Sequence, residues 1–331
     1  MAVNRNKRGI ALDLREPREL DQARELIRRA DVVIDNYAAG TLEKLGLGTS
    51  ELHRLRPGIV SIAMSAFGAT GPLSGIRGYG STVEQASGLP FANGCENWPP
   101  TMQHVAWGDP IAGLFGAVAA MAAISGQART GGVAIDLSQV ESLFQVGADA
   151  FVAAQVNDAP VPRLGSRRLT YAPCGAFATV GDDDWIAVAV AEIGEWRALC
   201  RVIGREDLAE NSELDTIAGR NAVAAEIEAA ISHWSEKRNR EEAAELLQRA
   251  GVCAVPLHRG RDLLEDAHLL ACNFWRHVNR RHIGRYVQAM SPYRLDGARP
   301  DIRRVPPLLG EHTSEVLGEI EMSQDNEESV G

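Results

Sequence analysis

Residues 107–114 read Trp-Gly-Asp-Pro-Ile-Ala-Gly-Leu, and they open the longest apolar segment of the chain. From Ile111 to Ser125 this segment has no charged side chain, and small residues alternate with large apolar ones. The pattern predicts a buried helix around which the rest of the chain is organised. We place Asp109 at the N-cap and Pro110 at the first helical position, where first-turn amides can hydrogen-bond an ionised carboxylate. Capping alone accounts for an aspartate there.

The chain before this helix is expected to form a parallel sheet. Gly9–Leu14 alternates like a strand, Glu16–Ala30 keeps an apolar face at helical spacing, and Asp31–Asp35 is again a strand. This order is a βαβ unit, whose crossover is right-handed. Further strands at Ile59–Ser65 and Val133–Leu137 extend the sheet. The predicted fold class is therefore α/β.

Two loops of this part are candidates for ligand binding. Asn36–Gly40 follows a strand directly, at the edge of a parallel sheet where open α/β proteins place their ligands, although an ordinary turn explains it equally well. The segment 67–81 is dense in glycine, which lets the backbone approach a ligand closely. A short helix at Thr82–Ser87 follows it.

The second half of the chain has a different texture. Residues 174–190 form a hairpin whose turn holds Asp182–Asp184, and these aspartates lack the wider ligand pattern of a calcium site. Helices, a further strand, a second strand pair and a final amphipathic helix follow. We expect a large domain over residues 1–170, a small α+β domain over 171–290, and a return to the large domain over 291–331.

Composition limits the classes of function. The net charge is −10 and the pI about 5.4, so the overall field disfavours nucleic acid and anionic membranes as partners. The five cysteines have neither disulfide-framework nor zinc spacing, and no metal is implied. The start of the chain has no apolar signal region, and Ile111–Ile124 is judged too short to span a bilayer. We therefore expect a cytoplasmic protein.

Six short motifs occur in one order between about Asn4 and Ile320. They are Asn-x-Asn-Lys-Arg, Ala-Asp-Val-Val-x-x-Asn-Tyr-x-x-Gly, Gly-x-Thr-Gly-Pro, Gly-Asp-Pro-x-Ala-Gly, Arg-Thr-Gly-Gly with Ile-Asp-Leu-Ser-Gln, and Pro-Leu-Leu-Gly-Glu-His-Thr. Together they resemble the class III coenzyme A transferases of the CaiB/BaiF type. That family includes formyl-CoA:oxalate transferase, carnitine CoA-transferase and α-methylacyl-CoA racemases.

The resemblance implies a Rossmann-like large domain built from both chain ends, an inserted small domain and an interlocked dimer. It places Asp109 on the family's catalytic aspartate. Its carboxylate would attack an acyl-CoA thioester, form an acyl–aspartyl anhydride and then an aspartyl–CoA thioester, and a carboxylic acid acceptor would complete the exchange. Coenzyme A would be bound as part of the acyl-CoA substrate.

The same resemblance suggests further site residues. The adenine and phosphate end of CoA would meet Asn6, Lys7 and Arg8, and the nucleotide or pantetheine would lie beside Asn36 and Tyr37. Arg77 aligns loosely with a basic residue near the CoA phosphates, and Tyr79, Gly80 and Glu84 would line the acyl pocket. Glu84 is equally compatible with a helix residue that has no role in the site.

Two departures from the family pattern keep alternatives open. The strand–helix–strand unit that opens family members is absent, so we expect exposed sheet edges and helix faces, with poor solubility or a complementing partner chain. The racemase branch has Gly-His-Asp where this chain has Gly78–Gly80, and tyrosine is a poor proton-transfer base. A CoA-transferase is therefore favoured over a racemase or epimerase and over an impaired CoA-binding subunit.

Overall fold

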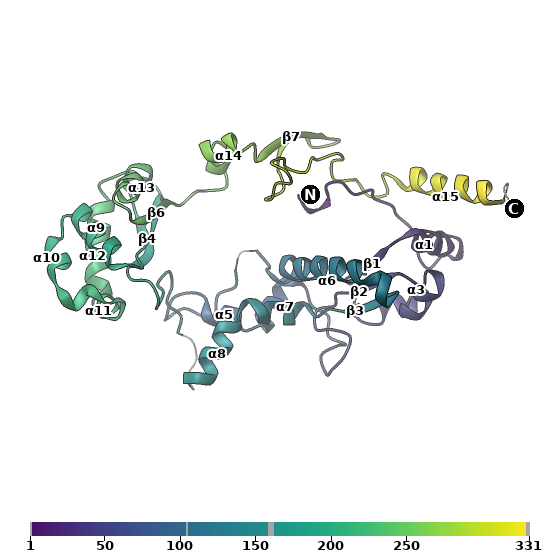
Figure 1. The fold of residues 1–331 in the computed structure, drawn as a ribbon, viewed down its shortest axis with the longest axis horizontal. Coiled ribbons are helices and arrows are strands. Elements are labelled where there is room, and N and C mark those ends of the chain that lie inside the picture. Colours follow the sequence, from purple (N-terminus) through teal and green to yellow (C-terminus); the bar gives the residue numbers. More distant parts are fainter. Residues whose placement is uncertain (1, 104, 158–161, 329–331) are drawn as a thin grey trace. The chain divides into compact units, whose positions relative to one another are not determined.

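Three parallel strands, β1 (Val32–Asp35), β2 (Val60–Ala63) and β3 (Val133–Asp136), form the predicted sheet in the order β1-β2-β3. Val32 pairs with Val60, which pairs with Val133, so the strands are in register over their whole length. The computed structural model of the protein describes residues 2–103, 105–157 and 162–328. Figure 1 shows these strands with the helices that cover them.

Alternate residues of the strands pack against helices on opposite faces of the sheet. On one face, Val33 packs with Ile27 and Leu52 of α1 (Pro17–Arg29) and α3 (Thr49–Leu55). On the other face, Val60, Ile62 and Met64 form a cluster with Ala112 and Ala120. Ala112 and Ala120 belong to the long helix α6 (Gly108–Thr130), so the predicted apolar helix covers one face of the sheet.

The chain folds as two compact units. Unit 1 comprises Met1–Ala92, Pro100–Val161 and Ala271–Gly331, and unit 2 comprises Asn93–Pro99 and Pro162–Leu270. The expected borders lay at residues 170 and 290. The hairpin of β7 (Trp275–Arg280) and β8 (Gly284–Ala289) belongs to unit 1, and Arg5 Nη1 donates a hydrogen bond to the Ala289 carbonyl 2.7 Å away.

The expected strand at Gly9–Leu14 is wrong, because these residues contact the far end of the chain instead of the sheet. Gly9 N–H donates to His312 Nδ1 at 3.1 Å, and His312 N–H donates back to the Gly9 carbonyl at 2.9 Å. Ala11 N–H donates to Thr313 Oγ1 at 3.0 Å. The Pro-Leu-Leu-Gly-Glu-His-Thr motif thus holds the two chain ends together at the start of α15 (Thr313–Glu328).

The remaining elements of unit 1 follow the predicted order. Ser138 caps α7 as predicted, since its Oγ accepts a hydrogen bond from Glu141 N–H at 3.4 Å. The helix expected to continue to about Val156 breaks at Gly147. The elements not yet named are η1 (Ala2–Asn4), α2 (Thr41–Lys44), α4 (Gly80–Ala86), α5 (Leu89–Ala92), α7 (Gln139–Val146), α8 (Ala148–Asn157) and, at the border with unit 2, α14 (Ala267–Ala271).

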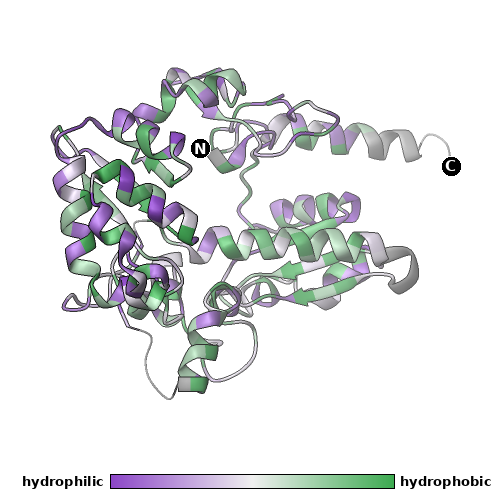
Figure 2. Cartoon of the chain, turned by 60° about the vertical axis from the view of Figure 1, so that its left-hand side comes forward, coloured by the Kyte–Doolittle hydropathy of each residue, from purple (hydrophilic) through white to green (hydrophobic). Residues whose placement is uncertain are grey.

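Helix α6 corrects the predicted start of the apolar segment. It begins at Gly108, so Asp109 is its second residue and Pro110 its third, and Asp109 is not the N-cap. Ala112 is buried on the sheet, whereas Leu114 and Val118 are 65% and 69% exposed. Figure 2 shows the hydrophobic colouring of this helix. Helix α6 is therefore apolar on both sides and buried on only one.

The length of α6 also corrects an expectation. Residues Gly108–Gly126 are long and apolar enough to cross a membrane by length and composition, because the helix extends beyond the uncharged run at both ends. One such helix is weak evidence for a membrane span, since core helices of globular proteins have the same properties. Ala112 and Ala120 pack against the sheet, while 22% of the span is buried within the unit.

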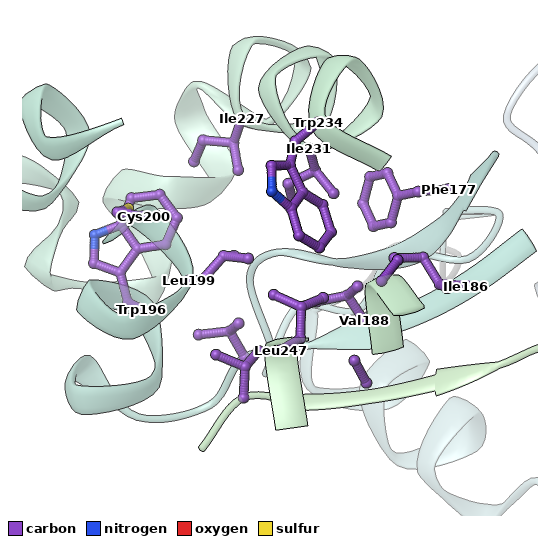
Figure 3. Packing of buried hydrophobic residues seen from close by; sticks show 14 of the residues in the cluster. Phe177, Ile186, Val188, Trp196, Leu199, Cys200, Ile227, Ile231, Trp234 and Leu247 are labelled. Carbon is purple, nitrogen blue, oxygen red and sulfur yellow. The ribbon is translucent and has the colours of Figure 1, made fainter. Parts of the chain in front are cut away.

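Unit 2 is the smaller α+β unit and has its own core. Its antiparallel sheet has the order β4-β5-β6, and Ile186 and Val188 point from β5 into the core beside Phe177, Trp196 and Trp234 (Figure 3). The strands are β4 (Cys174–Ala178), β5 (Trp185–Ala189) and β6 (Cys253–Pro256), and the helices are α9 (Ile193–Ile203), α10 (Glu206–Glu210), η2 (Ser212–Asp215), α11 (Ile217–Ala222), α12 (Ala224–Ser235), α13 (Arg240–Arg249) and η3 (Asp262–Leu264).

Two of the three aspartate side chains of the β4–β5 turn contact other protein groups, and the turn connects two antiparallel strands as the predicted hairpin requires. Asp183 Oδ1 accepts from Trp185 Nε1 at 2.7 Å. Asp184 Oδ1 lies 3.4 Å from Arg240 Nη1 and 3.2 Å from Arg259 Nη2. These ion pairs connect the turn to the start of α13 and to the segment after β6.

The buried thiol of Cys200 gives a prediction about reactivity. Burial, with a smaller contribution from the charge of Asp207, raises the pKa of Cys200 to about 12. The raised pKa keeps the thiol protonated at pH 8, and a protonated thiol is a poor nucleophile. We expect iodoacetamide at pH 8 to modify the exposed Cys95 and Cys253 in the folded chain and to spare Cys200. Peptide mass spectrometry checks this, and equal labelling of all three would contradict it; labelling in denaturant is the control.

Candidate active site

Asp109 presents its carboxylate in the first turn of α6, close to the first residue of α4. The residue is exposed, and no hydrogen bond to its carboxylate is formed within the described residues. A methyl group in place of the Gly80 hydrogen would lie 2.6 Å from Asp109 Oδ2 and 3.1 Å from the Ala106 Cβ. The Asp109 carboxylate therefore lies directly against the Gly80 backbone.

Two glycines permit the close approach of α4 and α6 at this point. A Cβ on Gly108 would lie 2.9 Å from the Gly80 carbonyl oxygen and 3.2 Å from the Val83 Cβ. The glycine-rich sequence around residues 67–81 suggested that backbone approaches a ligand there. The structure shows that Gly108 permits backbone contact between the two helix starts, whereas Gly80 leaves room for the Asp109 and Ala106 side chains.

Substitution of Gly80 tests this arrangement. We expect Gly80→Ala to displace the Asp109 side chain and to lower any activity that depends on its carboxylate about 10- to 100-fold, because small misplacements of a catalytic group have effects of this size. The stability should fall modestly, because the carboxylate end of Asp109 can move aside but the Ala106 Cβ, 3.1 Å from the new methyl group, must shift by a few tenths of an ångström. Turnover of purified variants and denaturant unfolding measure the two effects.

Gly113→Ala is the matched control for this prediction. Gly113 lies in the same helix as Asp109, and a Cβ there would meet no atom within 4 Å. Alanine at an exposed helix position should stabilise the helix by roughly 0.5–1 kcal/mol without changing activity. Equal activity of the Gly80 and Gly113 variants would show that Gly80 does not control the position of Asp109.

Glu84, expected in the acyl pocket, is only 1% exposed and contacts backbone instead. Its Oε1 accepts from Gln103 N–H at 2.8 Å, and its Oε2 accepts from Trp107 N–H at 3.1 Å. Both donors lie in the segment that leads into α6. The structure therefore places the Glu84 carboxylate in contact with the backbone that precedes α6 and Asp109.

The side chains of Tyr79 and Arg77 lie at the surface before α4. Tyr79 is 83% exposed and immediately precedes Gly80. Arg77 is exposed, and no ion pair of its guanidinium is formed within the part of the chain that the structure describes. The structure thus leaves both side chains available to a ligand that reaches Asp109.

The expected CoA residues at the N-terminus are largely engaged with the C-terminal segment. Asn6 Oδ1 accepts from the backbone N–H groups of Arg303 and Arg304 at 2.8 and 3.0 Å. Arg8 Nη1 lies 2.7 Å from Glu319 Oε1 and 3.2 Å from Glu315 Oε1. These contacts account for Asn6 and Arg8 as links between the chain ends.

Lys7 differs from its neighbours. It is exposed and donates to the neutral Asn4 Oδ1 at 3.1 Å. No ion pair of Lys7 occurs among residues 2–103, 105–157 and 162–328. Among the described residues, the charge of Lys7 is thus less compensated than that of Arg8, which pairs with two glutamates.

A cavity of about 190 Å³ lies at the carboxyl ends of the three parallel strands. Tyr37 lines it from the loop after β1, and Asn36 is exposed next to Tyr37. The cavity is where open parallel sheets place their ligands. The polar residues in its lining are Asp35, Thr41, Glu43, Thr49, Ser61, Ser65 and Asp136.

Several of these cavity residues were missed from the sequence. Ser61 and Ser65 are 7% and 6% exposed, and their hydroxyls have no hydrogen-bond partner within the described chain. Burial raises the pKa of Asp35, the Tyr37 N–H bond opposes that rise, and the charge of Glu43 adds to it. For Asp35 and Ser65 the signal was their position at or just after the carboxyl end of a strand, a rule that the sequence analysis applied only to the loop Asn36–Gly40.

Among the residues that the structure describes, no three His, Cys, Asp or Glu side chains lie close enough together to hold a metal ion. Asp109 itself presents an exposed carboxylate. Such a group acts in proteins as a base or as a nucleophile.

Known proteins share this architecture. A family model described as CoA-transferase family III matches residues 1–313. Succinyl-CoA–D-citramalate CoA-transferase of Chloroflexus aurantiacus is 27% identical over 96% of this chain and 79% of its own. The beta subunit of succinyl-CoA–L-malate CoA-transferase from the same organism is 29% identical over 97% of this chain and 80% of its own. A CAIB/BAIF family protein from Brucella suis has a crystal structure with a TM-score of 0.85, 25% identity, and coverage of 96% of this chain and 83% of that one.

Proposed function

The chain belongs to CoA-transferase family III and is a CoA-transferase, and from that premise we propose that Asp109 carries the acyl group and then CoA during the transfer. The observation that supports this role is the free, exposed carboxylate at the start of α6, held against the Gly80 backbone. Covalent catalysis divides one difficult acyl transfer into easier steps.

The proposed reaction begins when an Asp109 oxygen attacks the thioester carbonyl of the donor. The carbon–sulfur bond breaks, CoA leaves as the thiolate, and an acyl–aspartyl anhydride remains. The thiolate then attacks the Asp109 carbonyl, which releases the donor acid as a carboxylate and forms an aspartyl–CoA thioester.

The second half of the reaction repeats these steps with the acceptor. The acceptor carboxylate attacks the aspartyl thioester, forms a new anhydride and releases the thiolate. Attack of the thiolate on the acceptor carbonyl yields the new acyl-CoA and restores Asp109. Each step needs hydrogen-bond donors near a carbonyl on which negative charge develops.

The CoA moiety is proposed to lie along the carboxyl edge of the sheet, from the cavity towards Asp109. Asn36 and Tyr37 would flank the nucleotide or pantetheine, and the cavity beside Tyr37 supports that position. Lys7 and Arg77 would meet phosphates, since the structure pairs neither with a carboxylate among its described residues. Tyr79 would line the acyl pocket. Asn6 and Arg8 would bind CoA only after giving up their contacts with the C-terminal segment.

Trapping the intermediates tests the proposal. We would incubate the purified chain with succinyl-CoA, the donor in the names of both curated relatives above, and then add hydroxylamine. Hydroxylamine cleaves anhydrides and thioesters and converts the attached Asp109 carboxyl group to a hydroxamate. A hydroxamate on the peptide containing Asp109 supports the proposal. Complete CoA exchange with no modified Asp109 would contradict it.

A second candidate is an enzyme that is active only with a partner chain. The exposed large side chains of α6, among them Leu114, Val118 and Met121, favour it, because a contiguous apolar face of this kind usually has a partner. The partner could be a second copy, as in the dimer that the family resemblance suggests, or a complementing chain. Adduct formation by the chain in its monomeric fraction from size-exclusion chromatography would exclude this candidate.

A further inference from the structure

We propose that Glu84 is a positioning residue, which fixes the segment before α6 and thereby the place of Asp109. This inference rests on the proposed function of Asp109. It assigns Glu84 a role behind the reacting group, in place of the expected position in the acyl pocket.

The first argument is that Glu84 is a buried carboxylate whose partners among the described residues are backbone N–H donors. Its oxygens accept from Gln103 and Trp107, 2.8 and 3.1 Å away, and no ion pair of Glu84 occurs within the described chain. Bringing a carboxylate into the interior without a cation is costly, and the cost is reduced by well-directed N–H groups. The two hydrogen bonds therefore hold the segment strongly to α4.

The second argument is the position of one of these donors, Trp107, directly before the start of α6. The Trp107 carbonyl accepts a hydrogen bond from Ile111 N–H at 3.1 Å, so Trp107 is the residue from which α6 starts. The positive end of the helix dipole lies there and stabilises an anion. Glu84, a residue of α4, thus caps the N-terminus of α6. It holds Trp107, which lies two positions before Asp109.

The third argument is that Glu84 lies one turn after Gly80 on the same helix. Gly80 contacts the Asp109 carboxylate, while Glu84 holds Trp107. Helix α4 consequently contacts α6 on both sides of Gly108 and sets the direction in which Asp109 leaves the backbone. A shift of this segment would move the carboxylate relative to a bound thioester.

Glu84→Gln is the most informative variant. It keeps the shape of the side chain, but its amide group presents one acceptor and one donor to two N–H donors. One of the two backbone amides then loses its partner. The control is Gln139→Leu, which removes a buried hydrogen bond from Gln139 Nε2 to the Met64 carbonyl, 3.2 Å long, elsewhere in unit 1.

Two measurements on the full chain decide the proposal. Hydrogen exchange followed by mass spectrometry reports on the amides of Gln103 and Trp107 without requiring activity. We expect exchange there to rise at least about 10-fold in Glu84→Gln and to stay unchanged in the control. Adduct formation at Asp109 should slow about 10- to 100-fold, with the KM for acyl-CoA unchanged and an unfolding midpoint close to that of the control.

Several results would overturn the proposal. Unchanged exchange in Glu84→Gln would show that Glu84 does not hold the segment. Increased exchange with a normal adduct rate would show that the segment does not control Asp109. If the wild-type chain and any partner form no adduct, the proposed function fails, and the exchange comparison alone then supports or overturns the link between Glu84 and the segment.

Discussion

Asp109→Asn is expected to lower the rate of CoA transfer by at least about 10³-fold, because removal of a covalent nucleophile typically has effects of this size. The asparagine side chain has nearly the same shape as the aspartate and keeps the contact with Gly80. It cannot form the anhydride, since its amide is a weak nucleophile. Steady-state transfer from succinyl-CoA to a panel of carboxylic acids measures the effect.

Glu141→Gln is the matched control for Asp109→Asn. Glu141 is also an exposed carboxylate in the first turn of a helix in unit 1, and both residues have the same relation to a helix dipole. Each substitution should change stability by less than about 1 kcal/mol, but only that of Asp109 should remove activity. Asp109→Ala guards against slow deamidation of asparagine to aspartate. Retention of a tenth of the activity in the alanine variant would exclude Asp109 as the nucleophile.

Arg220→Leu is expected to destabilise unit 2 by about 2–4 kcal/mol, the range for loss of several hydrogen bonds to buried acceptors. Arg220 is 1% exposed and donates to the carbonyls of Ala172, Leu214 and Asp215. Its guanidinium also lies 5.5 Å from the centre of the Trp196 ring. Burial lowers its pKa. Leucine would leave three carbonyl groups without a donor inside the unit.

Arg249→Leu makes the same chemical change at the surface of unit 2. Its ion pair with Glu245 is 2.6 Å long but mostly exposed, and such pairs contribute at most about 1 kcal/mol. Hydrogen exchange of peptides from β4 and β5 reports on unit 2 separately from unit 1. If the two leucine variants were equally stable, the buried guanidinium would not be needed to join Ala172 to the helices.

Local pattern was sufficient to predict most elements of the fold. The helical spacing before Ala30 gave α1, and the alternation of Ile186 and Val188 gave a strand with one buried face. The segment Gly9–Leu14 has the same alternation and is not a strand. Its partners, His312 and Thr313, lie at the other end of the sequence, and no local pattern shows which distant group will bind a backbone amide.

The candidate site was predictable to a smaller extent. Asp109 is a candidate because the motif around it is short and contiguous. The adjoining apolar run predicts it as the N-cap, whereas the structure has it as the second residue of α6. The role of Glu84 was not evident, since the same spacing is compatible with a pocket residue or a simple helix residue. Its contacts are with backbone amides of Gln103 and Trp107, which have no signature in the side-chain sequence. Ser61 and Ser65 were read as strand residues for a similar reason.

The link between the chain ends has a consequence for the order of folding during synthesis. Gly9 and Ala11 bind residues 312 and 313, which the ribosome adds late. Most of unit 2 is a continuous segment, Pro162–Leu270, so its core can be completed while unit 1 still lacks its last part. Domains generally fold as units as they emerge. The nascent chain should therefore carry a folded unit 2 while unit 1 is still incomplete. The N-terminal segment of unit 1 lacks its C-terminal partner, and depends on chaperones, until residues 312 and 313 have been synthesised.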